Sequence, residues 1–151
     1  MMAKDRFLDD FKLGEIFLTE GITITESEII RFAMQYDPQS FHLDVTAASK
    51  SPYGGLIASG FHALSICLRM FIQKGVFASC SIGSPGIDEV RWLAPVRPGD
   101  TLRTETEVLE IKPSSSRPDR GILRMRYAGI NQRGEKVISF ILNHLLLRQT
   151  I

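Results

Sequence analysis

Residues 59–75 read SGFHALSICLRMFIQKG, and this segment constrains the fold more than any other. Ser59 suits an N-cap and Gly75 suits a C-terminal stop, so the pattern predicts a helix between them. Its polar side chains recur every three or four residues and form one narrow stripe: His62, Ser65, Arg69 and Gln73. The rest of the circumference is apolar, and most of this helix must therefore be buried.

A flat sheet would cover only one side of such a helix, whereas a sheet that curls around it would cover more. Strand-like composition or alternation occurs at residues 14–24, 87–93, 101–111, 122–130 and 137–148. Long neighbouring strands with turn or loop connections predict an antiparallel sheet. We therefore expect an α+β chain in which a curved antiparallel sheet wraps around a long central helix, an arrangement known as the hot-dog fold.

Two shorter helical segments precede the central helix. Residues 25–28, TESE, have the form of a capping box and open a helix that stops before Pro38. Residues 37–41 are then expected to be a constrained loop. Asp44 is expected to cap a short helix that runs through Ala48.

The composition bounds the class of protein. A chain of 151 residues has the size of one domain, so residues 1–151 are interpreted as a single domain. Its 18 Lys and Arg against 17 Asp and Glu give a net charge of +1, which predicts no nucleic-acid or membrane partner. Residues 60–74 are too short and too polar to cross a bilayer. The N-terminus has no apolar signal core, so a cytoplasmic location is expected.

The cysteine content argues against two kinds of site. Cys67 and Cys80 are the only cysteines, and neither stands in a CxxC or Cys/His cluster. Neither a disulfide scaffold nor a metal site is therefore expected.

Asp37 and His42 are the first candidates for chemistry. They lie five residues apart across the expected loop, where a carboxylate and an imidazole can meet around one water molecule. Such a pair suits general acid–base catalysis near neutral pH. Spacing alone nevertheless favours a structural interpretation, in which Asp37 caps the loop and His42 fills space.

Several motifs together resemble the MaoC-like dehydratase family, which includes the (R)-specific enoyl-CoA hydratases. The motifs are Asp37-x-Gln39-x-x-His42, residues 54–60 (GGLIASG), residues 90–102 (VRWLAPVRPGDTL) and residues 131–134 (NQRG). The resemblance runs from about Gly14 to Arg148. Two positions depart from the family pattern: Ser40 stands where a proline is usual, and Ser59 where a histidine is often found.

The resemblance implies a reaction and a site. Asp37 and His42 would position and activate a water that adds to an α,β-unsaturated thioester, giving an (R)-3-hydroxyacyl product. The amide at Gly60 would bind the thioester oxygen. Gln39 would orient the loop or the water, with a solvated polar loop residue as the alternative. Coenzyme A would belong to the substrate, with no separate cofactor. A homodimer or a higher homo-oligomer is expected, because a single unit would leave an edge strand unpaired.

Two other functions fit the same fold. An acyl-CoA thioesterase would place its carboxylate in or beside the central helix, but residues 60–74 contain no Asp or Glu. A non-catalytic protein that binds acyl thioesters is the third possibility, since fold does not fix function.

The remaining notable side chains are interpreted as structural. His62 is expected to be a structural histidine, His144 a packing or interface residue, and the Ser59 hydroxyl a helix cap. Tyr53 and Trp92 are interpreted as core residues, with the walls of an acyl tunnel as the alternative.

Overall fold

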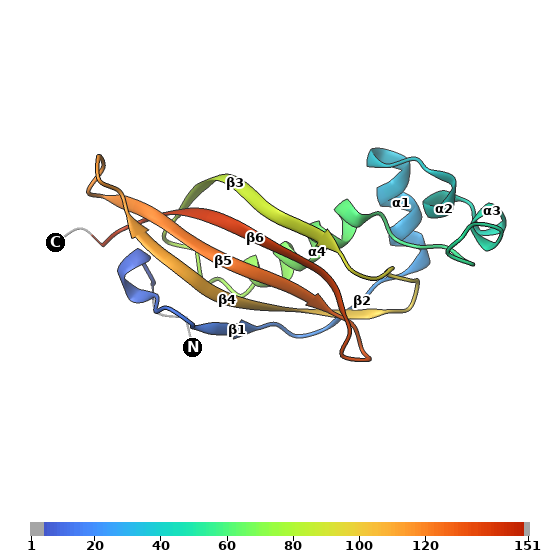
Figure 1. Ribbon diagram of the computed structural model, residues 1–151, viewed down its shortest axis with the longest axis horizontal. Coiled ribbons are helices and arrows are strands. Elements are labelled where there is room, and N and C mark those ends of the chain that lie inside the picture. Colours follow the sequence, from blue (N-terminus) through green and yellow to red (C-terminus); the bar gives the residue numbers. More distant parts are fainter. Residues whose placement is uncertain (1–4, 150–151) are drawn as a thin grey trace.

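The computed structural model describes residues 5–149, and within them a six-stranded antiparallel sheet curves around helix α4 (Figure 1). The strands are β1 (Ile16–Leu18), β2 (Ile22–Thr23), β3 (Ser81–Trp92), β4 (Thr101–Pro113), β5 (Arg120–Ile130) and β6 (Lys136–Leu147). Their order is β1-β4-β5-β6-β3, and β2 also pairs with β4. The predicted hot-dog fold is confirmed. The ends of the predicted domain, residues 1–4 and 150–151, lie outside the described residues.

The helices lie on one side of the sheet and beyond one of its ends. They are a short 3₁₀ turn (Leu8–Asp10), α1 (Glu26–Tyr36), α2 (Ser40–Leu43), α3 (Val45–Ser49) and α4 (Gly60–Ile72). Helices α1 to α3 gather beyond the N-terminal end of α4, past the end of the sheet (Figure 1). None of the helices in the described part of the chain has the length and apolar character needed to cross a membrane.

Helix α4 has the predicted buried face, with two differences. Ser65, Arg69 and Gln73 of the polar stripe are exposed, but His62 is buried and its ring stacks on Phe32 of α1 at 4.7 Å. The apolar side chains of Phe61 and Ile72 are 61% and 45% exposed. Much of the helix is buried as expected, but these two apolar side chains are exposed because one sheet does not close around the helix.

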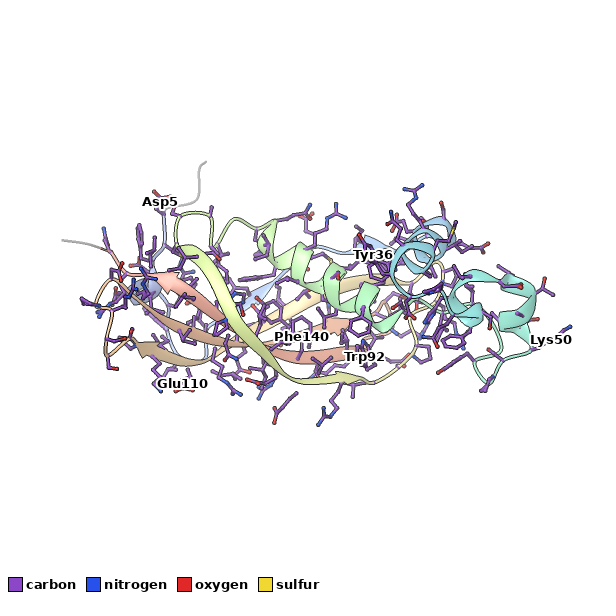
Figure 2. The ribbon with its side chains drawn as sticks, turned by 90° about the horizontal axis from the view of Figure 1, so that it is seen from above. Asp5, Tyr36, Lys50, Trp92, Glu110 and Phe140 are labelled. Atoms are coloured by element: carbon purple, nitrogen blue, oxygen red, sulfur yellow. The ribbon has the colours of Figure 1, made fainter. Side chains whose placement is uncertain are left out.

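The core lies between α4 and the concave face of the sheet. Leu123, Met125 and Tyr127 alternate along β5 and are fully buried, as the period of two predicts. The Tyr127 ring stacks on Phe140 of β6, which lies between the sheet and α4 (Figure 2). The Tyr127 hydroxyl is hydrogen-bonded to Nε2 of His144, so His144 is a core residue, as expected.

The expected loop at residues 37–41 is only partly a loop, because Ser40–Leu43 form helix α2. The amide of His42 donates to the carbonyl of Gln39, and the amide of Asp44 donates to that of Ser40. Pro38 stops α1 as predicted, yet it lies far enough upstream to leave these amides free to form a new helical turn. The predicted cap at Asp44 is confirmed, since its carboxylate accepts from the amide of Ala47 at 2.9 Å.

The segment predicted as one strand, residues 14–24, is two strands. The regular pairing with β4 is interrupted between them, although the amide of Thr19 still donates to the carbonyl of Thr104. Gly21 lies in the gap, where an added Cβ would approach the methyl group of Thr101 to 2.9 Å. This close approach explains why a residue without a side chain stands at the break.

Hydrogen bonds to the carboxylate of Asp100 join two turns at one end of the sheet. One carboxylate oxygen of Asp100 accepts from the amide of Arg97 at 2.9 Å, and the other accepts from the side-chain amide of Gln132 at 2.8 Å. Val96, next to this turn, accepts a hydrogen bond from the amide of Ala58 at 2.8 Å. The motifs at residues 90–102 and 131–134 thus contact each other and hold the segment that leads into α4.

Strand β3 forms one edge of the sheet and is longer than predicted. It begins at Ser81, whereas the sequence pattern placed it from residue 87, because Gly83, Pro85 and Gly86 are typical of turns. Its pairing with β6 shifts register three times, and Glu89 has a positive φ of 51°. Irregular pairing with β6 therefore accommodates residues that a regular strand would exclude.

Candidate active site

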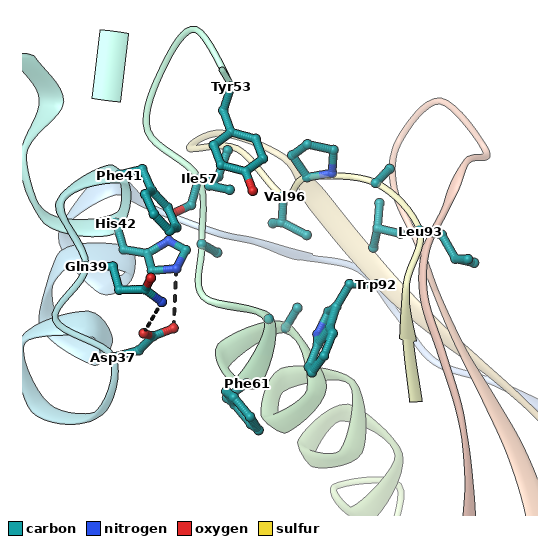
Figure 3. A pocket seen from close by; sticks show the side chains of 16 residues that line it. Asp37, Gln39, Phe41, His42, Tyr53, Ile57, Phe61, Trp92, Leu93 and Val96 are labelled. Atoms are coloured by element: carbon teal, nitrogen blue, oxygen red, sulfur yellow. Dashed lines mark hydrogen bonds and ion pairs between the residues drawn. The ribbon is translucent and has the colours of Figure 1, made fainter. Parts of the chain in front are cut away.

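A cavity of about 410 Å³ opens between α2, the start of α4 and the end of β3 (Figure 3). Asp37, Gln39 and His42 supply its polar side chains on one wall. Gly60 and Trp92 lie on the opposite wall. The structure thus brings all four site residues predicted from the sequence, Asp37, Gln39, His42 and Gly60, to one cavity.

Asp37 follows the last residue of α1, and its carboxylate is held from two sides. Oδ1 accepts a hydrogen bond from Nε2 of Gln39, and Oδ2 accepts one from Oγ of Ser59, both at 2.7 Å. Burial acts to raise the pKa of Asp37, but the hydrogen bonds from Ser59 and Gln39, together with His42, outweigh it. The pKa of this carboxyl is therefore lower than usual, and Asp37 is ionised at neutral pH.

His42 is only 4% exposed, and both of its ring nitrogens have defined neighbours. Nδ1 lies 2.7 Å from the carbonyl oxygen of Ile57. Because a carbonyl can only accept, Nδ1 carries a proton, and in the neutral ring Nε2 presents a lone pair. That Nε2 lies 3.3 Å from Oδ2 of Asp37, an ion-pair contact when the ring is protonated, so an imidazole and a carboxylate face the same space (Figure 3).

Ser59 connects the carboxylate to the start of α4. Its hydroxyl donates to Asp37 and also accepts from the amide of Phe61 at 3.3 Å, which caps the helix. The sequence pattern predicted the cap but missed the contact with Asp37. The sequence did offer one indication of this contact. Ser59 stands where the MaoC-like family often has a histidine, so a polar side chain is retained at this position.

Gly60 begins α4 and touches the indole of Trp92. A Cβ at this position would lie 2.3 Å from Nε1 of Trp92, so only glycine permits the contact. Within residues 5–149 the amide of Gly60 has no hydrogen-bond partner. A helix N-terminus with a free amide beside a cavity can stabilise negative charge on a bound oxygen.

Two aromatic side chains were interpreted as core residues, and that interpretation is wrong. Tyr53 and Trp92 line the cavity, and Trp92 is 48% exposed. Their positions at the cavity agree better with the alternative interpretation, in which both side chains flank the acyl group of a substrate. By contrast, His62 and His144 do not line this cavity, in agreement with the structural role expected for them.

Comparison with known proteins gives a consistent picture. An uncharacterised protein of Bacillus subtilis, YdeM, is 35% identical over 93% of this chain and 99% of its own length. Mesaconyl-CoA hydratase of Cereibacter sphaeroides is 43% identical over 90% of this chain, which spans only 39% of that enzyme. The crystal structure of a MaoC-like dehydratase from Rhodospirillum rubrum superimposes with a TM-score of 0.89. It is 40% identical and covers 97% of this chain and 99% of its own.

The match to a family extends over most of the chain. Residues 10–123 match the family described as MaoC like domain. This range includes Asp37, His42 and the start of α4, and so covers the cavity wall that carries the polar side chains. The chain therefore belongs to the MaoC-like domain family.

Proposed function

We propose that the protein is a hydratase that adds water to a 2-enoyl-CoA thioester and forms an (R)-3-hydroxyacyl thioester, or catalyses the reverse dehydration. The observation that supports this most directly is the acid–base pair at the cavity wall, in which Nε2 of His42 lies 3.3 Å from Oδ2 of Asp37. A carboxylate and an imidazole beside one cavity can bind a water molecule and exchange protons with it.

The proton transfers follow from this arrangement. The pair removes one proton from the water as its oxygen bonds to C3 of the substrate. A proton returns from the pair to C2, so that the side chains end in their initial protonation state. Gln39 and Ser59 restrict the Asp37 carboxylate, which keeps its orientation fixed while the charge moves. The reaction needs acid–base groups and no separate cofactor.

The thioester oxygen gains negative charge during the addition. The free amide of Gly60 is suited to stabilise it, because a donor at a helix N-terminus is fixed before the reaction starts. With the thioester bound at Gly60 and the water bound at Asp37 and His42, water reaches only one face of the double bond. We assign the (R) configuration to that face.

The relatives support this reaction class. One is named a mesaconyl-CoA hydratase and a similar structure is described as a MaoC-like dehydratase. A thioesterase is not favoured, because α4 contributes Gly60, Phe61 and Ala63 to the cavity and no carboxylate. A protein that only binds acyl thioesters would not need an ionised carboxylate and an imidazole in contact at the cavity wall.

One incubation distinguishes these functions. The protein is mixed with crotonyl-CoA or a longer trans-2-enoyl-CoA, and the loss of conjugated absorbance and the release of free thiol are followed separately. We expect loss of conjugation without thiol release, and chiral analysis should identify the (R)-3-hydroxyacyl product. Thiol release at the rate of substrate loss would indicate a thioesterase. No change with a broad panel of enoyl thioesters would favour a binding protein.

We further propose that the functional unit is a homodimer or a multiple of it. The outer edge of β3 is exposed together with Ile82 and Ile87, and the neighbouring face of α4 exposes Phe61 and Ile72. Apolar residues on an edge strand and on an adjacent helix indicate an association surface. A second copy would cover both and lie beside the cavity.

Light scattering at micromolar concentration tests this association. We expect the mass of a dimer or its multiple for the wild type, and a shift toward the monomer for Ile87→Lys. A wild-type monomer would refute the association. Lys112→Glu, an exposed change at the far end of β4, is the control and should leave the mass unchanged.

A further inference from the structure

Apart from Asp37, Gln39, His42 and Tyr53, the side chains that line the cavity are apolar or, at Trp92, largely apolar. Apart from His42, the lining residues with less than 8% of their surface exposed are apolar, and among them we call Ala58, Ala63, Val96 and Val137 the floor. The lining residues that are themselves more exposed, such as Tyr53 and Leu93, form its rim. The cavity is therefore a pocket with a polar side wall and a floor without hydrogen-bonding side chains.

The orientation of a thioester in this pocket follows from size. Coenzyme A is too large for a cavity of about 410 Å³ and must extend outward through the rim. With the reacting carbons held between His42 and Gly60, the part of the acyl group beyond C3 is directed to the floor. At ~30 Å³ for a water-sized group, the volume admits on the order of a dozen non-hydrogen atoms.

The charges around the pocket are of one sign. Among the described residues, no Lys or Arg lines it, and its only carboxylate is Asp37, which is ionised at neutral pH. Arg97 lies nearby, but its guanidinium donates to the carbonyl of Tyr53 and packs beside Gly55. This arginine is thus held on the loop outside the pocket.

From these observations we infer that the pocket selects enoyl-CoA thioesters with an uncharged, apolar acyl tail and rejects dicarboxylic ones. This inference rests on the proposed hydratase function. A carboxylate at the floor would lose its hydration without gaining a donor, and Asp37 would repel it. The selection therefore arises from the missing partner for a negative charge, and not from lack of space.

Sequence similarity alone would suggest a dicarboxylic substrate for this chain. Mesaconyl-CoA hydratase, 43% identical over 139 residues, is named for an acyl group that carries a second carboxylate. The floor residues of this chain offer no cation to receive that group. Substrate charge is thus a property in which the two proteins are expected to differ.

Three related substrates that differ in charge or size test this selectivity. Glutaconyl-CoA carries a terminal carboxylate separated from the double bond by one methylene group. Its methyl ester is larger but neutral, and 5-methylhex-2-enoyl-CoA replaces the carboxylate with a group of the same branching. We expect kcat/KM for glutaconyl-CoA to be at least about 100-fold below that of the other two.

The outcomes separate the inference from the function on which it rests. Hydration of glutaconyl-CoA as fast as that of 5-methylhex-2-enoyl-CoA would overturn the charge selection and leave the hydratase function intact. Equal rejection of the acid and its ester would show that size, not charge, decides, and would also overturn it. Failure to hydrate any enoyl thioester, crotonyl-CoA included, would instead refute the proposed function.

A pair of variants tests the electrostatic cause. Leu93 lines the cavity and is 53% exposed, so a longer polar side chain fits there without entering the core. Leu93→Arg should raise the ratio of glutaconyl-CoA to 5-methylhex-2-enoyl-CoA hydration at least tenfold, whereas the neutral Leu93→Gln should not. An equal ratio in the two variants would refute the electrostatic explanation.

Discussion

Replacing Ser59 with alanine removes one oxygen atom that has two partners. Its hydroxyl donates to Oδ2 of Asp37 at 2.7 Å and accepts from the amide of Phe61 at 3.3 Å. The first contact concerns the candidate active site and the second concerns the start of α4. Ser59→Ala is therefore expected to change both the pH dependence of the reaction and the stability of the fold.

The two contributions differ in size. A hydrogen bond to a charged group contributes about 1.5–3 kcal/mol. An N-cap contributes about 0.5–2 kcal/mol, and the long distance at Phe61 favours the low end of that range. Since Ser59 is fully buried, no water replaces its hydroxyl without rearrangement. We expect the free energy of unfolding at pH 7 to fall by about 2–4 kcal/mol.

Urea unfolding and the pH profile of kcat/KM measure the two effects. The hydrogen bond from Ser59 favours ionised Asp37, so its loss raises the pKa of Asp37 and moves the acid limb of the profile to higher pH. Ser65→Ala is the matched control, because Ser65 is exposed on the same helix and donates only to the carbonyl of Phe61. A destabilised Ser59→Ala with an unmoved acid limb would show that Ser59 is merely a cap.

Asp37→Asn and His42→Ala should each lower kcat of the folded protein by about 10²–10⁴-fold, whatever the change in melting temperature; full activity in the folded fraction of either variant would make the pair structural. Gly60→Ala should lower kcat/KM about 100-fold in steady-state assays, because its Cβ would lie 2.3 Å from Nε1 of Trp92; wild-type kcat/KM would contradict this steric requirement. Burial lowers the pKa of His144 to about 4, so below about pH 6.5 the unfolded chain binds a proton that the folded chain does not. Stability should therefore fall by about 3 kcal/mol between pH 6.5 and 4 in urea titrations, and His144→Gln should reduce this loss; the same pH dependence in both proteins would exclude His144 as its source.

Periodicity carried much of the fold prediction. The apolar pattern of residues 59–75 predicted α4, and the alternation of Leu123, Met125 and Tyr127 predicted the inner face of β5. Both signals arise because burial on one side imposes a period on the sequence. The resemblance to a family then selected Asp37 and His42, for which spacing alone favoured a structural role.

The features that were missed depend on contacts between distant segments. Ser59 lies 22 residues from Asp37, and no local pattern shows that the two side chains meet. The exposure of Phe61 depends on how far one sheet closes around a helix, which sequence periodicity does not report. Helix α2 is a single turn of four residues, too short to produce a detectable period.

The irregular pairing of β3 bears on how the protein behaves when concentrated. An exposed edge strand can recruit further strands without limit and produce fibrils. Here Pro85 lacks an amide donor, and the register shifts between Ser81 and Arg91 interrupt the spacing that a generic strand would need. A copy of the same chain related by a two-fold axis would repeat these irregularities in complementary order and close the edge. The edge of β3 can thus pair with a second copy of the chain, but it is poorly suited to add further strands and form fibrils.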